Sequence, residues 1–350
     1  MSLSKIKYIP FLLLLLLTGT LPACKDEEPL PVFDEATGSP SGTAIIITGA
    51  AARITQELAL LEALDNQGLL DDVRFISGVS SGAINTVMIN AVLDESNDFE
   101  WEDYKDIVLN LEQSDVLVND NNNLPVNTQP LWRTFDRTFK EQLGFQTMQD
   151  LPISSAVTAA AIDLQGLVSA SNVPELSTFD GDITEVIMAS ASFPVAFPSI
   201  KIGDNIYVDG GLQENIPVSV ALQFQLIDNI PFERIYIVSY QKNRSMDWGR
   251  ELSLLGVERT RKDLLEISLK RAGFNTDQLS EASFNKNLEL IQQQYPQFAS
   301  RTMVFVPAIE DLPYYGVFDF NNQTARESYD RVSTWAQSNS PLPLSDYLDQ

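Results

Sequence analysis

The chain has 350 residues, of which 44% are hydrophobic and 20% are charged, and this suffices for one large α/β domain or two small ones. Acidic residues outnumber basic residues 48 to 23, and the net charge of −25 argues against binding to nucleic acid or electrostatic adhesion to anionic lipid headgroups. The single cysteine excludes an internal disulfide, and the absence of histidine excludes histidine zinc sites and Ser-His-Asp triads. Nucleophilic catalysis in this chain therefore requires a base other than histidine.

The first residues are typical of an export signal. Lys5 and Lys7 precede an apolar run at 11–17 that is short for a membrane span, and Ala23 stands directly before Cys24. This end resembles a bacterial lipobox, which implies that cleavage leaves Cys24 as the lipidated first residue. An ordinary signal peptide that ends beside a free cysteine is the alternative.

These features predict three parts of the chain. Residues 1–23 form a lipoprotein signal peptide, residues 24–42 an acidic tether rich in Pro, Gly and Ser, and residues 43–350 a single domain. Acyl chains on Cys24 would supply the membrane attachment that an acidic surface cannot. We therefore expect an exported protein, anchored by lipid at the bacterial cell envelope, at the outer membrane.

The start of the domain alternates strand and helix patterns. Residues 44–47 and 73–76 are short β-branched or apolar runs, typical of buried parallel strands. Residues 53–65 and 81–93 carry apolar side chains at helical spacing. This order predicts a βαβ unit with a parallel sheet and right-handed crossovers.

The remaining elements extend this plan. We expect helices at 101–111, 131–143 and 183–192, a polar loop at 119–123, and strands at 155–162, 206–208, 234–239 and 302–306. The segment 242–300 is charged, amphipathic and helical, and no repeat period stands out. Because the expected strands run from 43 to 306, we predict one α/β domain with helical decoration.

The motif Gly78-Val79-Ser80-Ser81-Gly82 fits G-x-S-x-G. In this motif the serine sits on a sharp turn from a strand to a helix, and flanking glycines let the backbone crowd there. The expected strand before it and helix after it fit this geometry, which marks Ser80 as a nucleophile. The alternative is a glycine-rich turn with incidental serines.

Asp209-Gly210-Gly211 follows the expected strand at 206–208. With no histidine available, Asp209 is the candidate base for Ser80, its carboxylate emerging at a strand end. A carboxylate of ordinary pKa is a weak base for a hydroxyl, so burial and a hydrogen bond to the serine would have to assist it. Taken alone, Asp-Gly-Gly is more often a turn than a catalytic site.

In this order, the two motifs resemble the Ser-Asp dyad of the patatin-like phospholipases. Residues 189–198 (ASASFPVAFP) are similar to that family's small-residue helix and F-P bend, and residues 161–166 to its middle strand and turn. The likeness covers about 44–218. It implies a three-layer α/β/α fold with a mainly parallel sheet, a lipid or ester substrate, and neither a metal nor an organic cofactor.

One loop departs from that family. Its first strand ends in G-G-G-x-[RK]-G, whose backbone N–H groups form the oxyanion hole, whereas this chain has Gly49-Ala50-Ala51-Ala52-Arg53-Ile54. Alanine still provides the N–H donors, but in a left-handed conformation it costs about 1–2 kcal/mol. The loop is therefore intact, weakened or inactive, and Arg53 either steers an anionic headgroup or anchors the loop.

The favoured hypothesis is a serine acyl hydrolase of the lipase or phospholipase type. Ser80 attacks the ester, Asp209 takes the proton, and the N–H groups of Gly49, Ala50 and Ala51 hold the oxyanion before water releases the acyl group. The rival hypothesis is a catalytically silent lipoprotein that uses the same fold to bind lipid or act as a scaffold. Protein partners are unknown, and residues 219–350 carry no motif tied to a function.

Overall fold

The computed structural model describes residues 33–164, 166–242 and 246–350. The expected signal peptide, Cys24 and the first part of the expected tether lie outside these residues. Across the described ranges, no helix combines the length and the apolar character needed to cross a membrane.

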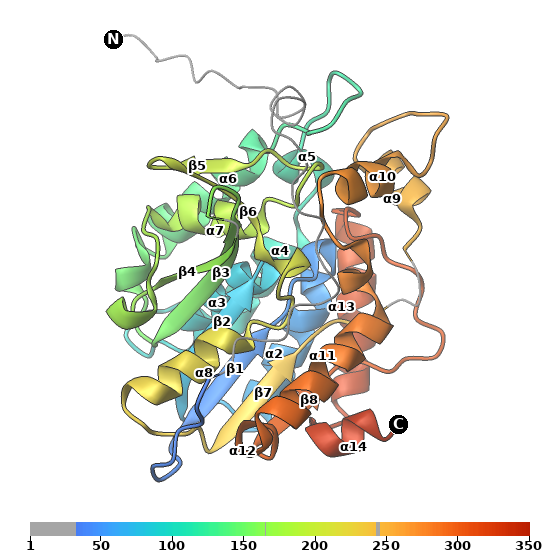
Figure 1. Ribbon diagram of the computed structural model, residues 1–350. Coiled ribbons are helices and arrows are strands. Elements are labelled where there is room, and N and C mark those ends of the chain that lie inside the picture. Colours follow the sequence, from blue (N-terminus) through green and yellow to red (C-terminus); the bar gives the residue numbers. More distant parts are fainter. Residues whose placement is uncertain (1–32, 165, 243–245) are drawn as a thin grey trace.

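The strands form one mixed sheet (Figure 1). They are β1 (Thr43–Ile47), β2 (Val73–Val79), β3 (Ser155–Ala161), β4 (Gly166–Ser171), β5 (Ile200–Ile202), β6 (Asn205–Asp209), β7 (Arg234–Val238), β8 (Thr302–Phe305) and β9 (Leu342–Pro343). Their order is β5-β6-β3-β2-β1-β7-β8-β9, with β4 paired to β3. The five central strands from β3 to β8 are parallel, and β4, β5, β6 and β9 add antiparallel pairs at the two ends. The expected mainly parallel sheet is confirmed.

Helices connect the strands and cover both faces. They are α2 (Ile54–Asn66), α3 (Ser81–Val92), α4 (Trp101–Leu109), α5 (Gln113–Val116), α6 (Gln129–Phe135), α7 (Ile183–Ala191), α8 (Val218–Ile227), α9 (Trp248–Leu254), α10 (Leu264–Arg271), α11 (Glu281–Gln294), α12 (Pro296–Ala299), α13 (Asn322–Ala336) and α14 (Leu344–Leu348). Short 3₁₀ turns are η1 (Ala51–Arg53), η3 (Met148–Asp150), η4 (Pro174–Leu176), η5 (Gly210–Leu212) and η6 (Thr276–Leu279), and η2 (Asp136–Gln142) is a π-helix that continues α6.

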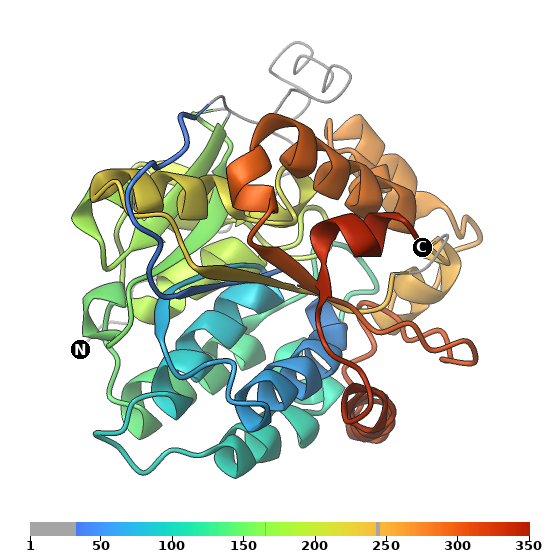
Figure 2. The same ribbon diagram turned by 90° about the horizontal axis from the view of Figure 1, so that it is seen from below.

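The sheet separates two helical layers, as Figure 2 shows, with α8, α11 and α14 on one side and α2, α3 and α13 on the other. Strand β1 explains why both faces are covered, because its side chains alternate between the layers. Ala44 and Ile46 pack in the cluster that contains α8 and α11, whereas Ile45 and Ile47 pack with α2 and α13. All four are fully buried, so the strand is apolar throughout, as expected for the centre of a parallel sheet. The fold is the expected three-layer α/β/α arrangement.

Three strands were not expected from the sequence. The hairpin partner β4 follows the turn after β3, β5 pairs with β6, and the sheet ends at β9 rather than at the expected strand 302–306. These strands lie at or near the sheet edges and are short or rich in small residues (IKI, LP, GLVSAS). They therefore lack the β-branched runs by which the buried parallel strands are recognised.

Candidate active site

The backbone turns sharply at Ser80, between β2 and α3. Ser80 has φ of 57°, a left-handed value that is rare for a non-glycine residue. The flanking glycines are required by crowding, since a Cβ on Gly78 would lie 2.0 Å from the carbonyl oxygen of Gly82. A Cβ on Gly82 would lie 2.3 Å from the carbonyl oxygen of Ile47 in β1. The expected strand-to-helix turn is therefore present, and it projects Ser80 from the end of β2.

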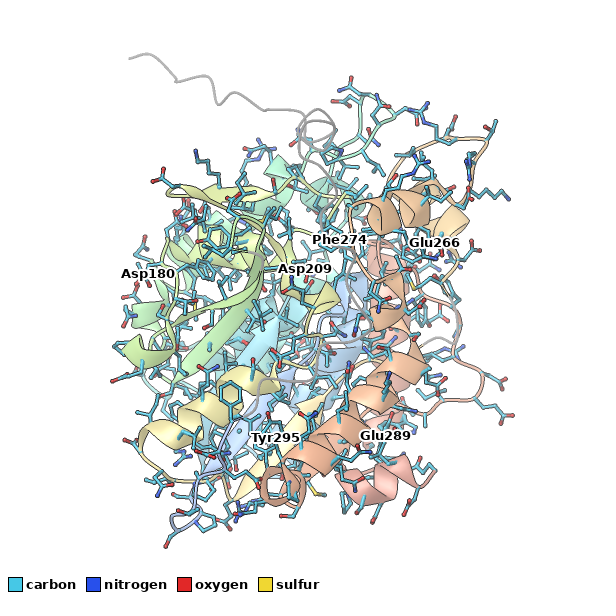
Figure 3. The ribbon with its side chains drawn as sticks, viewed as in Figure 1. Asp180, Asp209, Glu266, Phe274, Glu289 and Tyr295 are labelled. Atoms are coloured by element: carbon cyan, nitrogen blue, oxygen red, sulfur yellow. The ribbon has the colours of Figure 1, made fainter. Side chains whose placement is uncertain are left out.

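Strand β3 brings Asp209 to Ser80. The last residue of β2, Val79, pairs with Thr158, and the next residue of β3, Ala159, pairs with Asp209. Strand β6 runs antiparallel to β3, so it approaches from the opposite direction and ends where β2 ends. Asp209 therefore reaches Ser80 from an antiparallel strand, although the sequence suggested only that both residues emerge at strand ends. Figure 3 shows Asp209 in the interior of the molecule, at the end of β6.

The Asp209 carboxyl group is buried, and its neighbours include Gly211 and Ser80. Its exposed fraction is 3%, the Gly211 N–H donates to its Oδ1 at 2.7 Å, and the Ser80 hydroxyl lies close enough to lower its pKa. Burial raises the pKa of Asp209 to about 6, and the Ser80 hydroxyl and the Gly211 N–H offset part of that rise. This pKa makes the carboxylate a stronger base than an exposed aspartate while leaving it ionised at neutral pH.

The end of helix α7 links the two residues. Ser190 Oγ accepts a hydrogen bond from the Ser80 N–H at 2.9 Å and donates to the Thr158 carbonyl at 2.7 Å. Two residues later, the Ser192 carbonyl accepts from the Asp209 N–H at 3.0 Å. The segment 189–198, noted in the sequence only for its resemblance, thus fixes the backbone of both Ser80 and Asp209.

The 49–52 loop has fewer free backbone N–H groups than the sequence predicted. The Gly49 N–H donates to Asn215 Oδ1 at 3.1 Å, and the Ala50 N–H donates to Ser81 Oγ at 2.7 Å. These two groups are therefore engaged, which contradicts the expectation of three free oxyanion donors. Within the part of the chain that the structure describes, the Ala51 N–H has no hydrogen-bond partner. Ala51 has φ of 50°, so the expected left-handed strain falls on this residue.

Arg53 anchors the loop. Its side chain is 2% exposed and does not line the pocket beside Ser80. Its Nε donates to the Tyr315 carbonyl at 2.7 Å, and its guanidinium lies 5.0 Å from the ring centroid of Tyr240 and 5.5 Å from that of Tyr314. Of the two roles left open by the sequence, these contacts favour anchoring over recognition of a headgroup.

A segment before α13 covers the site. In addition to Arg53, the Ala52 N–H holds this 314–321 segment by donating to the Val317 carbonyl at 2.9 Å. From the other side, Glu251 Oε1 accepts from the Tyr314 hydroxyl at 2.6 Å and Oε2 from the Phe318 N–H at 3.1 Å. The segment is thereby fastened to both the 49–52 loop and α9.

Ser80 opens into an apolar pocket that is partly open to solvent. Helices α3 to α6, η2 and the 314–321 segment contribute most of its walls. The apolar lining residues with large side chains are Ile54, Ile84, Met88, Ile107, Val108, Leu111, Val116, Leu131, Phe135, Phe139, Phe193, Phe197, Phe318 and Phe320. Among the described residues, Asp319 is the one charged side chain of the lining. A lining of this kind is typical of sites that bind apolar ligands.

Sequence reasoning missed three buried polar residues that hold the site. Asn215 lies between the 49–52 loop and the Asp-Gly-Gly turn, and a Cβ at either Gly49 or Gly211 would come within 2.9 Å of its Oδ1. Ser190 and Glu57 are buried as well. Each is remote in sequence from the residues that it contacts, or stands in a helix as one polar residue among many. The sequence therefore gave no signal for them beyond the family resemblance of the segment around Ser190.

Comparison with known proteins identifies a family. A family model described as patatin-like phospholipase matches residues 45–222, and a comparison with curated proteins gives no match. Solved structures with similarity include VipD from Legionella pneumophila (12% identity, TM-score 0.37, 93% of this chain and 72% of that chain). Two others are the Pseudomonas aeruginosa type III effector ExoU (10%, 0.39, 86% and 54%) and human GIVD cytosolic phospholipase A2 (11%, 0.36, 88% and 59%). The chain thus spans little more than half the length of the latter two.

Proposed function

The chain belongs to the patatin-like phospholipase family, and from this premise we propose that it is a serine acyl hydrolase that cuts a lipid ester with Ser80 and Asp209. One observation carries the proposal. A buried carboxyl group lies beside the hydroxyl of a serine that lines an apolar pocket. This arrangement combines a nucleophile, a base of raised pKa and a site for an acyl chain.

The proposed reaction proceeds in two halves. Ser80 Oγ bonds to the ester carbonyl carbon while its proton passes to Asp209, and the intermediate collapses as the alcohol leaves with that proton. Water then attacks the acyl-serine, Asp209 takes the proton of the water, and the fatty acid departs as Ser80 regains its hydroxyl proton. The Ala51 N–H and the positive end of helix α3 would stabilise the oxyanion.

The acyl chain occupies the apolar pocket in this proposal. Its lining supports a substrate with a hydrocarbon tail, because burial of such a tail contributes roughly 0.8 kcal/mol for each CH₂ group. The lining gives no basic side chain for a phosphate, so the tail rather than the headgroup dominates recognition inside the pocket.

A catalytically silent lipid-binding protein is the second candidate. The engaged N–H groups of Gly49 and Ala50 favour it, because loss of one oxyanion donor typically costs on the order of 100- to 1,000-fold in rate. The Ser80–Asp209 contact favours the hydrolase, since lipid binding alone does not require a strained serine beside a buried carboxyl group.

Reaction of the full chain, purified in detergent, with a long-chain alkyl fluorophosphonate distinguishes the two. We expect covalent labelling that is absent in Ser80→Ala and on the order of 100- to 10,000-fold slower in Asp209→Asn, because the base is lost. Asp204→Asn, on the exposed turn before β6, is the matched control and should label normally. A folded wild-type chain that never labels would favour the binding protein, and labelling that persists in Ser80→Ala would refute the nucleophile.

Export and lipid anchoring at the outer membrane of a bacterial cell complete the proposal. They depend on the pattern of residues 1–24 alone, with the acidic tether as spacer. Incorporation of a palmitate analogue by cells that express the chain should be lost in Cys24→Ala. Unchanged incorporation in that variant would contradict lipidation at Cys24.

A further inference from the structure

A fully buried carboxyl group lies behind the catalytic turn without touching the pocket. Glu57, in the first turns of α2, accepts hydrogen bonds from Thr48 Oγ1 at 2.8 Å and from Asn85 Nδ2 at 2.9 Å. The Ser81 hydroxyl lies close enough to the same carboxyl group to lower its pKa. Glu57 thus binds the segment after β1 and helix α3, and it lies beside Ser81, the residue after Ser80. Nothing in the proposed reaction uses this group directly.

Ser81 connects Glu57 to the oxyanion loop. A hydroxyl has one proton to donate and lone pairs that accept. When that proton points to Glu57, a lone pair of Ser81 Oγ is free to face the loop, and there it accepts from the Ala50 N–H at 2.7 Å. The Ala50 N–H, next to the Ala51 N–H, is therefore held by a hydroxyl that lies beside Glu57.

The surroundings of Glu57 are dry and contain several titratable groups. Lys242 attracts it electrostatically, and the Lys242 Nζ lies 3.6 Å from the ring centroid of Tyr240. Arg53 lies close enough to repel Lys242, and Tyr104, on α4, donates to Asn85 Oδ1. Burial raises the pKa of Glu57 to about 8 and lowers the pKa of Lys242 well below its usual value.

A carboxyl group in such a place is not explained by stability. Well-packed apolar residues are often as good or better in a core, because a buried ionisable group carries a desolvation penalty. A buried carboxyl group that is in contact with several chain segments around one loop instead fixes the positions of those segments relative to one another.

We propose that Glu57 is a positioning residue that acts through the Ser81 hydroxyl to set the geometry of the 49–52 loop for the oxyanion of the acyl-transfer reaction. The kinetic part of this inference rests on the proposed function. Since Glu57 lies outside the acyl pocket, its loss should slow the reaction step without weakening the binding of an acyl chain.

Four variants of the full chain in detergent test this role. Glu57→Gln keeps the side-chain volume and replaces the carboxyl group by an amide that does not titrate, Ser81→Ala removes the link, and a double variant combines both changes. Glu214→Gln is the matched control, because Glu214 is also a buried carboxyl group, with a pKa raised to about 7 by burial, but it binds Ser219 at the start of α8. For each variant, the maximal rate and half-saturating concentration of fluorophosphonate labelling are measured, together with amide hydrogen exchange of a peptide that covers 48–53.

We expect Glu57→Gln and Ser81→Ala each to lower the maximal labelling rate about tenfold and to speed exchange in the 48–53 peptide about tenfold, with the half-saturating concentration unchanged. The double variant should be no slower than Ser81→Ala alone, because both changes break one chain of contacts. Glu214→Gln should change neither measurement.

The proposal fails if Ser81→Ala leaves loop exchange and labelling rate at wild-type values, a result that does not require Glu57→Gln to fold. It also fails if the two single effects multiply in the double variant, or if Glu214→Gln reproduces them. A wild-type chain that does not label would refute the hydrolase. In that case loop exchange still decides whether Glu57 positions the loop.

Discussion

Backbone strain at single residues is concentrated around the site. Among the described residues, five non-glycine residues have positive φ, and three of them, Ala51, Ser80 and Val195, surround the pocket mouth or the catalytic turn. Val195 is β-branched, has φ of 66°, and stands in the sequence midway between Phe193 and Phe197, which both line the pocket. Such conformations cost of order 1–3 kcal/mol each and persist where the surrounding structure enforces them. At Ser80 and in the 49–52 loop, the surrounding contacts are the hydrogen bonds with Ser190, Asn215 and Ser81.

Ala51 and Ala50 form a matched pair for measuring this strain. Ala51 has φ of 50°, whereas Ala50, one residue earlier, has φ of −127°. Ala51→Gly should raise the free energy of unfolding by about 1 kcal/mol, since relief of left-handed strain exceeds the added freedom of glycine in the unfolded chain. Ala50→Gly should lower the free energy of unfolding by about 0.5–1 kcal/mol, because this variant relieves no strain and only adds conformational freedom to the unfolded chain. Urea denaturation measures both, and equal destabilisation by the two variants would show that Ala51 is not strained.

At the scale of secondary-structure elements, the strands and helices predicted most accurately are the buried ones with an uninterrupted apolar pattern. The patterns at 44–47, 73–76, 53–65 and 81–93 correspond to β1, β2, α2 and α3 within a few residues. Strand β2 continues to Val79, three residues beyond its predicted end, because Ser77 and Gly78 pair with β1 despite their low strand propensity. In this case the sheet context determined the strand length and local propensity did not.

The same distinction applies to the site. Ser80 and Asp209 were found from motifs because each stands in a local pattern of glycines. Their supports were not found, since Ser190 contacts Ser80 across 110 residues and Asn215 contacts Gly49 across 166. Such contacts depend on which strands pair, and the pairing of antiparallel β6 with the end of β3 had no signal in hydrophobic periodicity. The choice between the two roles of Arg53, headgroup recognition and loop anchoring, likewise required knowledge of its burial.

At the scale of the whole molecule, the acidic composition and the buried carboxyl groups act in the same direction on stability. The net charge of −25 implies mutual repulsion that grows as more carboxyl groups ionise. Burial also raises the pKa of Glu57 to about 8, of Glu214 to about 7 and of Asp209 to about 6. Because the unfolded chain releases these protons near the usual values of 4.5 and 3.8, the folded chain binds more protons between those values and pH 8.

The free energy of unfolding should therefore fall as the pH rises, because stability decreases wherever the folded state binds the excess protons. The stabilisation from these groups is complete below about pH 4, falls progressively as the pH rises, and is lost for each group once the pH passes its folded pKa of about 6 to 8. We expect the midpoint of thermal unfolding to drop by on the order of 10 °C between pH 5 and pH 8. Glu57→Gln should flatten this slope, since glutamine does not titrate, whereas Asp204→Asn on the exposed turn should not.

Labelling of Ser80 should show the opposite trend. Asp209 must be ionised to take a proton, so the labelling rate should rise through about pH 6, where the pKa of this buried carboxyl group lies. Asp209 thus becomes active as a base only at pH values where its contribution to stability has already been lost. Differential scanning calorimetry from pH 5 to 8, run beside labelling rates at the same pH values, measures both trends. A thermal midpoint that is flat or rises over that range would contradict the assignment of protonated, buried carboxyl groups to the folded chain.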